Sequence, residues 1–129
     1  MSQAFADAMP FAKSLGLKIT KAEKDEIVGE LIVREDLCTT GSVMHGGAIM
    51  AVADSVGAIG GYLNLSEGAN GTTTVESKTN FLAAAPAGSE IKAIATPIST
   101  GRRLSVWQIV LTRADGKKVA LVTQTQLVL

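Results

Sequence analysis

The sequence lacks the residues on which disulfide and metal chemistry depend. Its 129 residues include one cysteine, one histidine and only 4% aromatic side chains. The single cysteine, Cys38, excludes an internal disulfide and a zinc site built from several thiolates. With His45 as the only histidine, a metal would need mostly carboxylate ligands, and the acidic residues show no ligand spacing. We therefore expect no metal and no cofactor.

An excess of charge of one sign is also lacking. The 12 basic residues equal the 12 acidic residues, so no overall field attracts nucleic acid or an anionic membrane. The scarcity of aromatic side chains argues against a surface that stacks single-stranded bases. Residues 1–18 contain no basic start followed by a continuous apolar run, so no secretory signal is indicated, and we expect a cytoplasmic protein.

The chain does contain enough apolar sequence for a core. Hydrophobic residues make up 47% of it and charged residues 19%, which is typical of a globular protein. The length predicts a single domain that spans residues 1–129.

The apolar pattern predicts an α+β architecture. We expect one short N-terminal helix, a hairpin over residues 17–36 and a loop over residues 37–44. From Thr72 onward apolar and polar residues alternate, which predicts about four antiparallel strands. The pair Asp115–Gly116 indicates a hairpin turn, and Pro97 predicts an edge strand or a bend.

Residues 45–63, "HGGAIMAVADSVGAIGGYL", form the most apolar segment. The pattern predicts a helix that is apolar or small almost all the way round, and therefore buried on most sides. A sheet that curls around the helix would bury it in this way, and an α+β layer with the helix flat on one sheet face is the alternative. A transmembrane helix is disfavoured by Asp54, Ser55 and the many glycines.

Asp54 is the one acidic residue in this helix. A buried carboxylate is costly unless it is paired, protonated or functional. An ion pair with Arg102, Arg103 or Lys78 is the structural interpretation, and we weigh it evenly against a functional one.

The spacing within the helix limits what Asp54 can do. Gly46 and Asp54 lie roughly 12 Å apart along the axis and about 80° apart around it. A Ser55–His45–Asp54 triad fails on the same distance. A second subunit would solve the problem, because the free N–H groups at the start of its helix suit an oxyanion. This predicts an obligate dimer with two symmetry-related sites.

The segment "GSVMHGGAIMAVADSVGA" resembles a known family, the hotdog-fold acyl-CoA thioesterases of the phenylacetate-degradation type. In that family an H-G-G motif is followed, nine residues after the histidine, by a catalytic acidic residue, and Asp54 stands at this position. The strand layout after Thr72, including "TGRRLSVWQIVLTRADGKKVA", is similar as well. The resemblance therefore covers nearly the whole chain.

The resemblance implies an antiparallel sheet wrapped around a long helix, assembled as a dimer or tetramer. It implies hydrolysis of an acyl-CoA to a free acid and CoA. Asp54 would be the nucleophile or the general base, and the N–H of Gly46 in the opposite subunit would polarise the thioester carbonyl. His45 would position this turn or contact the substrate. Thr74, with Thr72 as the second candidate, would supply a hydroxyl that helps to hold the water.

Two departures from the family pattern concern polar side chains. Related enzymes commonly carry Asn or Gln six residues before the histidine, where this chain has Thr39, with Thr40 beside it. Ala58 stands where one subfamily carries Ser or Thr, which favours Thr74 as the hydroxyl. On the basis of the resemblance, the residues assigned to substrate binding are Thr39, Gly47, Thr72, Arg102 and Arg103, the two arginines as contacts for the CoA phosphates.

Two other functions remain open at this point. A hotdog acyl-CoA hydratase or dehydratase would normally carry a second histidine motif, and this chain has only His45. A non-catalytic acyl-CoA-binding domain would keep the fold while leaving Asp54 exposed or salt-bridged in the dimer.

Overall fold

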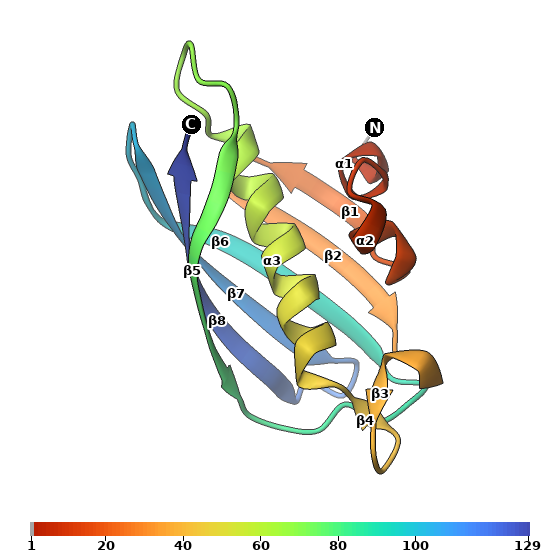
Figure 1. Cartoon of the computed structure of the whole chain (residues 1–129). Helices are drawn as coiled ribbons and strands as arrows, with labels where there is room; N and C mark the ends of the chain where they lie inside the picture. Colours follow the sequence, from red (N-terminus) through yellow and green to blue (C-terminus); the bar gives the residue numbers. More distant parts are fainter. Residues whose placement is uncertain (1) are drawn as a thin grey trace.

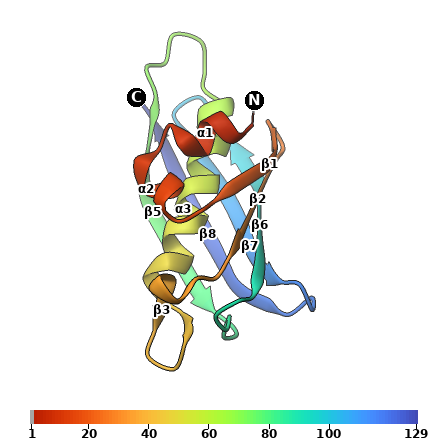
Figure 2. The same ribbon diagram turned by 90° about the vertical axis from the view of Figure 1, so that its right-hand side faces the viewer.

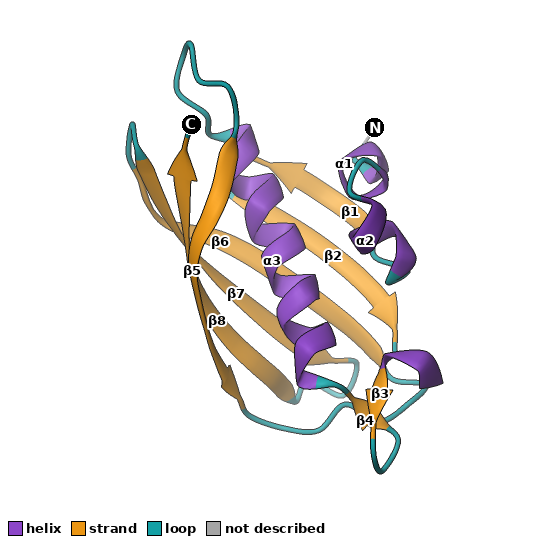
Figure 3. Ribbon diagram, in the orientation of Figure 1, coloured by secondary structure: helices purple, strands orange, loops and turns teal. Residues whose placement is uncertain are grey.

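A computed structural model describes residues 2–129 and shows one antiparallel sheet crossed by a long helix (Figures 1 and 3). The six strands of this sheet are ordered β1-β2-β6-β7-β8-β5, and a two-stranded ribbon, β3-β4, precedes the long helix. In chain order the elements are α1 (Gln3–Asp7), α2 (Pro10–Ser14), β1 (Lys18–Glu23), β2 (Glu26–Ile32), the 3-10 turn η1 (Glu35–Leu37), β3 (Cys38–Thr39), β4 (Val43–Met44), α3 (Gly46–Leu63), β5 (Thr72–Phe81), β6 (Glu90–Thr100), β7 (Leu104–Arg113) and β8 (Lys118–Val128).

The sheet curves around α3, which contacts all six of its strands. Figure 2 shows α3 on one face of the sheet, with α1 and α2 beside it near β1. The prediction of a sheet that curls around the helix is confirmed, because a flat layer would leave the edge strands out of reach. Half of α3 is buried by this packing, although by length and composition alone the helix could cross a membrane. Burial in the core accounts for its apolar character.

Glycines on α3 allow the close contact with the sheet. A Cβ on Gly60 would lie 2.7 Å from ring atoms of Trp107, which is fully buried at the centre of the sheet. The indole N–H of Trp107 donates to Ser105 Oγ at 3.0 Å, so burial leaves no donor unpaired there. The helix is therefore fixed in position by backbone-to-ring packing.

Three of the local predictions require correction. The single N-terminal helix is two short helices, because Pro10 occupies the first position of α2 and its missing N–H cannot continue α1. The loop over residues 37–44 contains the ribbon β3-β4. Pro97 does not mark an edge, since β6 lies between β2 and β7; the bend is confirmed as a register shift between Pro97 and Ser99.

The hairpins β1-β2 and β7-β8 and the four strands after Thr72 are confirmed. The edge strand next to the helix is β5, which pairs with β8 on one side only. Its register shifts between Thr74 and Glu76, and the intervening Val75 is exposed, as is Phe81 at the end of the strand. This edge therefore presents both unpaired backbone groups and apolar side chains to solvent.

Candidate active site

Asp54 lies on the exposed side of α3 and faces the edge strand β5. One of its carboxylate oxygens accepts hydrogen bonds from side chains of the sheet. Thr74 Oγ1 donates to Asp54 Oδ1 at 2.6 Å. Gln124 Nε2 donates to the same oxygen at 3.0 Å. Both donors are neutral, so the carboxylate is oriented without being neutralised by a cation.

The predicted ion pair of Asp54 is not formed. None of the ion pairs within residues 2–129 includes Asp54. Lys78 instead donates to Asn80 Oδ1 at 3.0 Å. Arg102 and Arg103 lie in the β6–β7 turn, where the carbonyl of Arg102 accepts from Ser66 Oγ, just beyond the C-terminal end of α3. The expectation that α3 is buried on most sides fails on the stripe that contains Met50 and Asp54, since both residues are exposed.

The hydrogen-bond network continues from Asp54 into the sheet through two glutamines that sequence analysis missed. Thr74 Oγ1 lies 2.6 Å from Gln126 Oε1, and Gln124 Nε2 lies 2.9 Å from the same oxygen. Gln126 Nε2 in turn donates to Thr72 Oγ1 at 3.3 Å. Thr72 is thus part of the network but is not in contact with Asp54, which favours Thr74 as the hydroxyl nearest the chemistry.

A sequence signal for these glutamines exists. The apolar alternation of β8 puts Val122, Gln124 and Gln126 on the face that meets α3, and both amides are buried, with 0% and 1% exposure. Polar side chains at two consecutive inward positions of a strand need specific partners. Together with one carboxylate on the facing helix, this pattern indicates a polar network.

His45 caps the N-terminus of α3. Its ring Nδ1 accepts from the backbone N–H of Gly47 at 2.8 Å, and the backbone N–H of His45 donates to the carbonyl of Leu37. In the neutral ring, an accepting Nδ1 leaves the proton on Nε2, so the exposed Nε2–H is available as a donor. The N–H of Gly47 is occupied by this cap, whereas Gly46, the first residue of the helix, has no preceding turn to accept its N–H.

Side chains lie close to both glycines of the H-G-G motif. A Cβ on Gly47 would lie 2.9 Å from Nδ1 of His45, and a Cβ on Gly46 would lie 3.2 Å from the ring of Phe81. An apolar depression of about 440 Å³ opens beside Gly46. Its lining residues are Met44, Gly46, Ile49, Phe81, Leu82, Ala83 and Ala84.

Within one protomer, the carboxylate and the helix N-terminus do not meet. Eight residues of continuous helix separate Gly46 from Asp54, which is about 12 Å at the rise of an α-helix. Thr39, in β3, is exposed and pairs with Val43 in the ribbon before His45. The protomer therefore brings Asp54 together with Thr74, and groups His45, Gly46 and Gly47 separately.

Cys38 lacks the features of a nucleophile. Desolvation raises the pKa of its thiol, and the nearby carboxylates of Glu35 and Asp36 raise it further. The thiol therefore stays protonated at neutral pH.

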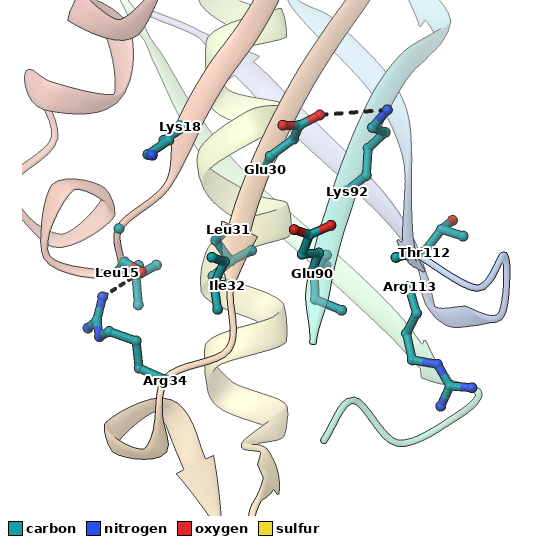
Figure 4. Close-up of a pocket in the computed structure, with 13 residues that line it drawn as sticks. Leu15, Lys18, Glu30, Leu31, Ile32, Arg34, Glu90, Lys92, Thr112 and Arg113 are labelled. Carbon is teal, nitrogen blue, oxygen red and sulfur yellow. Dashed lines mark hydrogen bonds and ion pairs between the residues drawn. The ribbon is translucent and has the colours of Figure 1, made fainter. Parts of the chain in front are cut away.

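A pocket of about 690 Å³ lies away from Asp54, and most of the side chains around it project from the sheet face opposite α3 (Figure 4). Several of its charged groups are engaged: Arg34 donates to the carbonyl of Leu15 at 3.0 Å, and Lys92 lies 3.6 Å from Glu30. Arg113 pairs with Asp115 at 2.7 Å. This pocket contains none of the residues predicted to carry the chemistry.

Similar proteins identify the family and share the fold. Residues 41–120 match the family model of the thioesterase superfamily. A Haemophilus influenzae protein named as an esterase is 32% identical over 113 residues, which are 88% of this chain and 80% of that protein. A crystal structure of a Haemophilus influenzae thioesterase has a TM-score of 0.90 at 27% identity, covering 100% of this chain and 90% of that chain.

Two more distant structures share the fold. The Escherichia coli PaaI protein of the phenylacetic acid degradation operon has a TM-score of 0.86 at 21% identity, covering 100% of this chain and 96% of that chain. A hypothetical thioesterase protein from Streptococcus pneumoniae, solved with coenzyme A, has a TM-score of 0.80 at 21% identity, with coverages of 88% and 85%. The chain therefore belongs to the thioesterase superfamily and is a thioester hydrolase with the hotdog fold.

Proposed function

We propose that this protein hydrolyses an acyl-CoA thioester to a free acid and CoA, with Asp54 as nucleophile or general base. The observation that carries the proposal is the way Asp54 is held. Oδ1 accepts from Thr74 and Gln124, whereas no hydrogen bond within residues 2–129 uses Oδ2. A carboxylate fixed through one oxygen and open at the other is oriented for attack or for proton abstraction.

The second half of the site comes from a partner subunit. The free edge of β5, with Val75 and Phe81 exposed, lies beside α3, on which Met50 is exposed. Covering this surface by a second copy would pair the strand edges and bury the apolar groups. A two-fold axis near Met50 would then set Asp54 opposite Gly46 of the partner subunit, because both residues are four positions from Met50.

In this dimer the residues divide the reaction between them. With Asp54 as general base, Oδ2 takes a proton from water, whose oxygen forms a bond to the thioester carbon. The free N–H of Gly46 of the partner subunit and the positive end of its helix stabilise the oxyanion. Collapse of this intermediate breaks the carbon–sulfur bond, and the CoA thiolate takes up the proton. The Nε2–H of His45 is oriented to donate to the substrate near the same turn.

The location of Arg102 and Arg103 supports a role at the distal part of CoA. Nine residues separate Asp54 from Leu63, about 14 Å along the helix, and Arg102 lies just past that end. An extended pantetheine arm has a length of this order. We propose that the two guanidinium groups contact the CoA phosphates and that Thr39 and Gly47 contact the substrate nearer the thioester.

The test is release of CoA, followed with a thiol reagent, over short, long and aryl acyl-CoA substrates. Wild type is compared with Asp54→Asn, after folding and oligomeric state of both have been confirmed. Loss of a general base costs about 10² to 10⁴ in rate, so we expect the variant to lose at least this much. If both proteins are inactive on every substrate while acyl-CoA still binds, the protein is a binding domain and the catalytic proposal is wrong.

A further inference from the structure

Two buried glutamines lie behind the proposed catalytic carboxylate, where glycines of α3 leave room for their side chains. A Cβ on Gly57 would lie 2.7 Å from Nε2 of Gln124, and a Cβ on Gly61 would lie 2.9 Å from Cγ of Gln126. Both amides are almost completely inaccessible to solvent. Burying two carboxamides beneath a helix is unfavourable unless their hydrogen bonds are made. Their partners therefore indicate what they do.

Gln124 directs its donors to the site and leaves its acceptor unused. Its Nε2 lies 3.0 Å from Asp54 Oδ1, 3.3 Å from the Asp54 carbonyl oxygen and 2.9 Å from Gln126 Oε1. Its own Oε1 is buried without a hydrogen-bond partner. An amide placed only to stabilise the fold would satisfy both ends. Gln124 instead has two hydrogens for four acceptors, the fourth being Thr74 Oγ1 at 3.4 Å.

The hydroxyl of Thr74 has two acceptors and only one hydrogen. Asp54 Oδ1 and Gln126 Oε1 each lie 2.6 Å from Thr74 Oγ1. When Asp54 is a carboxylate, the Thr74 hydrogen belongs to Oδ1, and Gln124 donates to both Oδ1 and Gln126 Oε1. Thr74 Oγ1 and Gln126 Oε1 are then in short contact with no hydrogen between them.

That second contact becomes a hydrogen bond once Asp54 holds a proton. A proton on Oδ1 donates to Thr74 Oγ1, and the Thr74 hydrogen turns to Gln126 Oε1. Gln124 then donates to Gln126 Oε1 and to the Asp54 carbonyl oxygen. Each hydrogen of Thr74 and Gln124 has an acceptor in both states. Only hydroxyl hydrogens reorient, because the N–H groups of Gln124 are fixed in the amide plane and one of them is shared between Asp54 Oδ1 and the Asp54 carbonyl oxygen.

We propose that Gln124 and Gln126 are positioning residues that act on Asp54 through Thr74, as a hydrogen-bond relay that accommodates Asp54 with and without a proton. This inference rests on the proposed function, since it assigns the relay to the same carboxylate. Neither glutamine reaches the surface where substrate would bind. Their effect is therefore on the turnover of bound substrate and not on its binding.

The test uses methionine, which has nearly the length of glutamine but no hydrogen-bonding amide. We expect Gln124→Met and Gln126→Met each to lower kcat on the order of 10- to 100-fold with KM little changed. Gln108→Met is the matched control, because Gln108 alternates to the opposite face of the sheet and pairs with Thr123. Its kcat should equal that of the wild type. Unchanged kcat in both relay variants would overturn the proposal.

A double-mutant cycle with Asp54→Asn separates the relay from a purely structural role. Asparagine has no proton to gain, so adding Gln126→Met should leave the residual rate of Asp54→Asn unchanged. A structural role would lower the residual rate by the same factor in both backgrounds, and this result would refute the relay. If Asp54→Asn itself keeps the wild-type rate, the proposed function fails, which is a distinguishable outcome.

Thr72→Val tests the relay from its far end, should a buried methionine prevent folding. Valine has the shape of threonine and removes the hydroxyl to which Gln126 Nε2 donates. We expect a several-fold lower kcat with unchanged KM. A wild-type kcat contradicts the relay, and a change in KM alone assigns Thr72 to substrate binding instead.

Discussion

Gly57 and Gln124 are matched across the contact between α3 and β8, since a Cβ on Gly57 would lie only 2.7 Å from Nε2 of Gln124. Gly57→Ala therefore displaces the amide that holds Asp54 Oδ1. Overpacking of this kind typically costs about 1–3 kcal/mol, and we expect a lower free energy of unfolding together with a lower kcat. Urea denaturation and CoA release measure the two effects.

Gly60→Ala is the control for this prediction. A Cβ at this position would lie 2.7 Å from the ring of Trp107, so it strains the same helix–sheet contact without touching the glutamines. We expect a comparable loss of stability but a kcat near that of the wild type, measured on the folded fraction. Equal losses of kcat in the two variants would mean that Gln124 has no specific link to Asp54.

Thr74 separates hydroxyl chemistry from side-chain volume. Its Oγ1 lies 2.6 Å from Asp54 Oδ1. Thr74→Val keeps the shape and removes the hydroxyl, so we expect kcat to fall on the order of 10- to 100-fold, in proportion to the misplacement of the carboxylate. Thr74→Ser keeps the hydroxyl and should retain most of the activity. If serine and valine behave alike in the CoA-release assay, the hydroxyl is not what Asp54 needs.

The sequence was sufficient to predict those parts of the site that depend on helical spacing. The H-G-G motif and Asp54 lie on one helix, whose geometry is regular, so their separation follows from the residue numbers. The second subunit that would bring them together stays a prediction. The resemblance named Thr74 as the hydroxyl that helps to hold the water, and in the structure this hydroxyl donates to Asp54 Oδ1. Its mechanistic role stays a prediction.

The glutamines could not be located in the same way. Gln124 is 70 residues from Asp54 in sequence, and their contact depends on the strand order that puts β8 next to β5. Register shifts in β5, β6 and β8 displace side chains by one position, and alternation alone does not reveal them. The predicted ion pair of Asp54 failed for the same reason, because local sequence does not show which strand faces the helix.

His45 has two roles that substitution can separate. Its Nδ1 caps α3 through the N–H of Gly47. His45→Ala should lower the free energy of unfolding by about 0.5–2 kcal/mol, whereas His45→Asn retains a good cap. Both variants lack the ring Nε2–H, and we expect both to lose CoA release. Full activity in His45→Asn would limit His45 to the cap.

The β7–β8 turn gives a prediction on pH. The hydrogen bond from Arg113, followed by that from the N–H of Lys117, lowers the pKa of Asp115 from 3.8 to about 2. A lowered pKa in the folded state stabilises the protein above pH 3.8, and this contribution is lost as the pH falls toward 2. Because Asp115 is exposed, the effect is small.

Asp115→Asn tests this contribution. At pH 6 the urea midpoint of the variant should lie below that of the wild type, and the difference should shrink as the pH approaches 2. A difference that stays constant over this range would show that the charge of Asp115 is not its source.

Met50 marks the place where the proposed dimer axis passes. In this dimer the two copies of α3 run antiparallel, with Asp54 opposite Gly46 of the partner subunit. Positions equally far before and after Met50 then face each other, so Met50 is the one residue of α3 that faces the same residue of the partner subunit. Met50 is exposed at 37% on the stripe that includes Asp54. A cysteine there, in a Cys38→Ser background, should form a disulfide-linked dimer under mild oxidation, seen on a non-reducing gel.

Tyr62→Cys in the same background is the matched control for the cross-link. Tyr62 is also exposed on α3, but it lies 12 residues from Met50 and would not face its own copy. It should therefore remain unlinked under the oxidation that links Met50→Cys. Linkage at Tyr62 instead of Met50 would separate Asp54 from Gly46 of the partner subunit. The oxyanion donor assigned to that N–H would then have to be found elsewhere, even if Asp54→Asn abolishes hydrolysis.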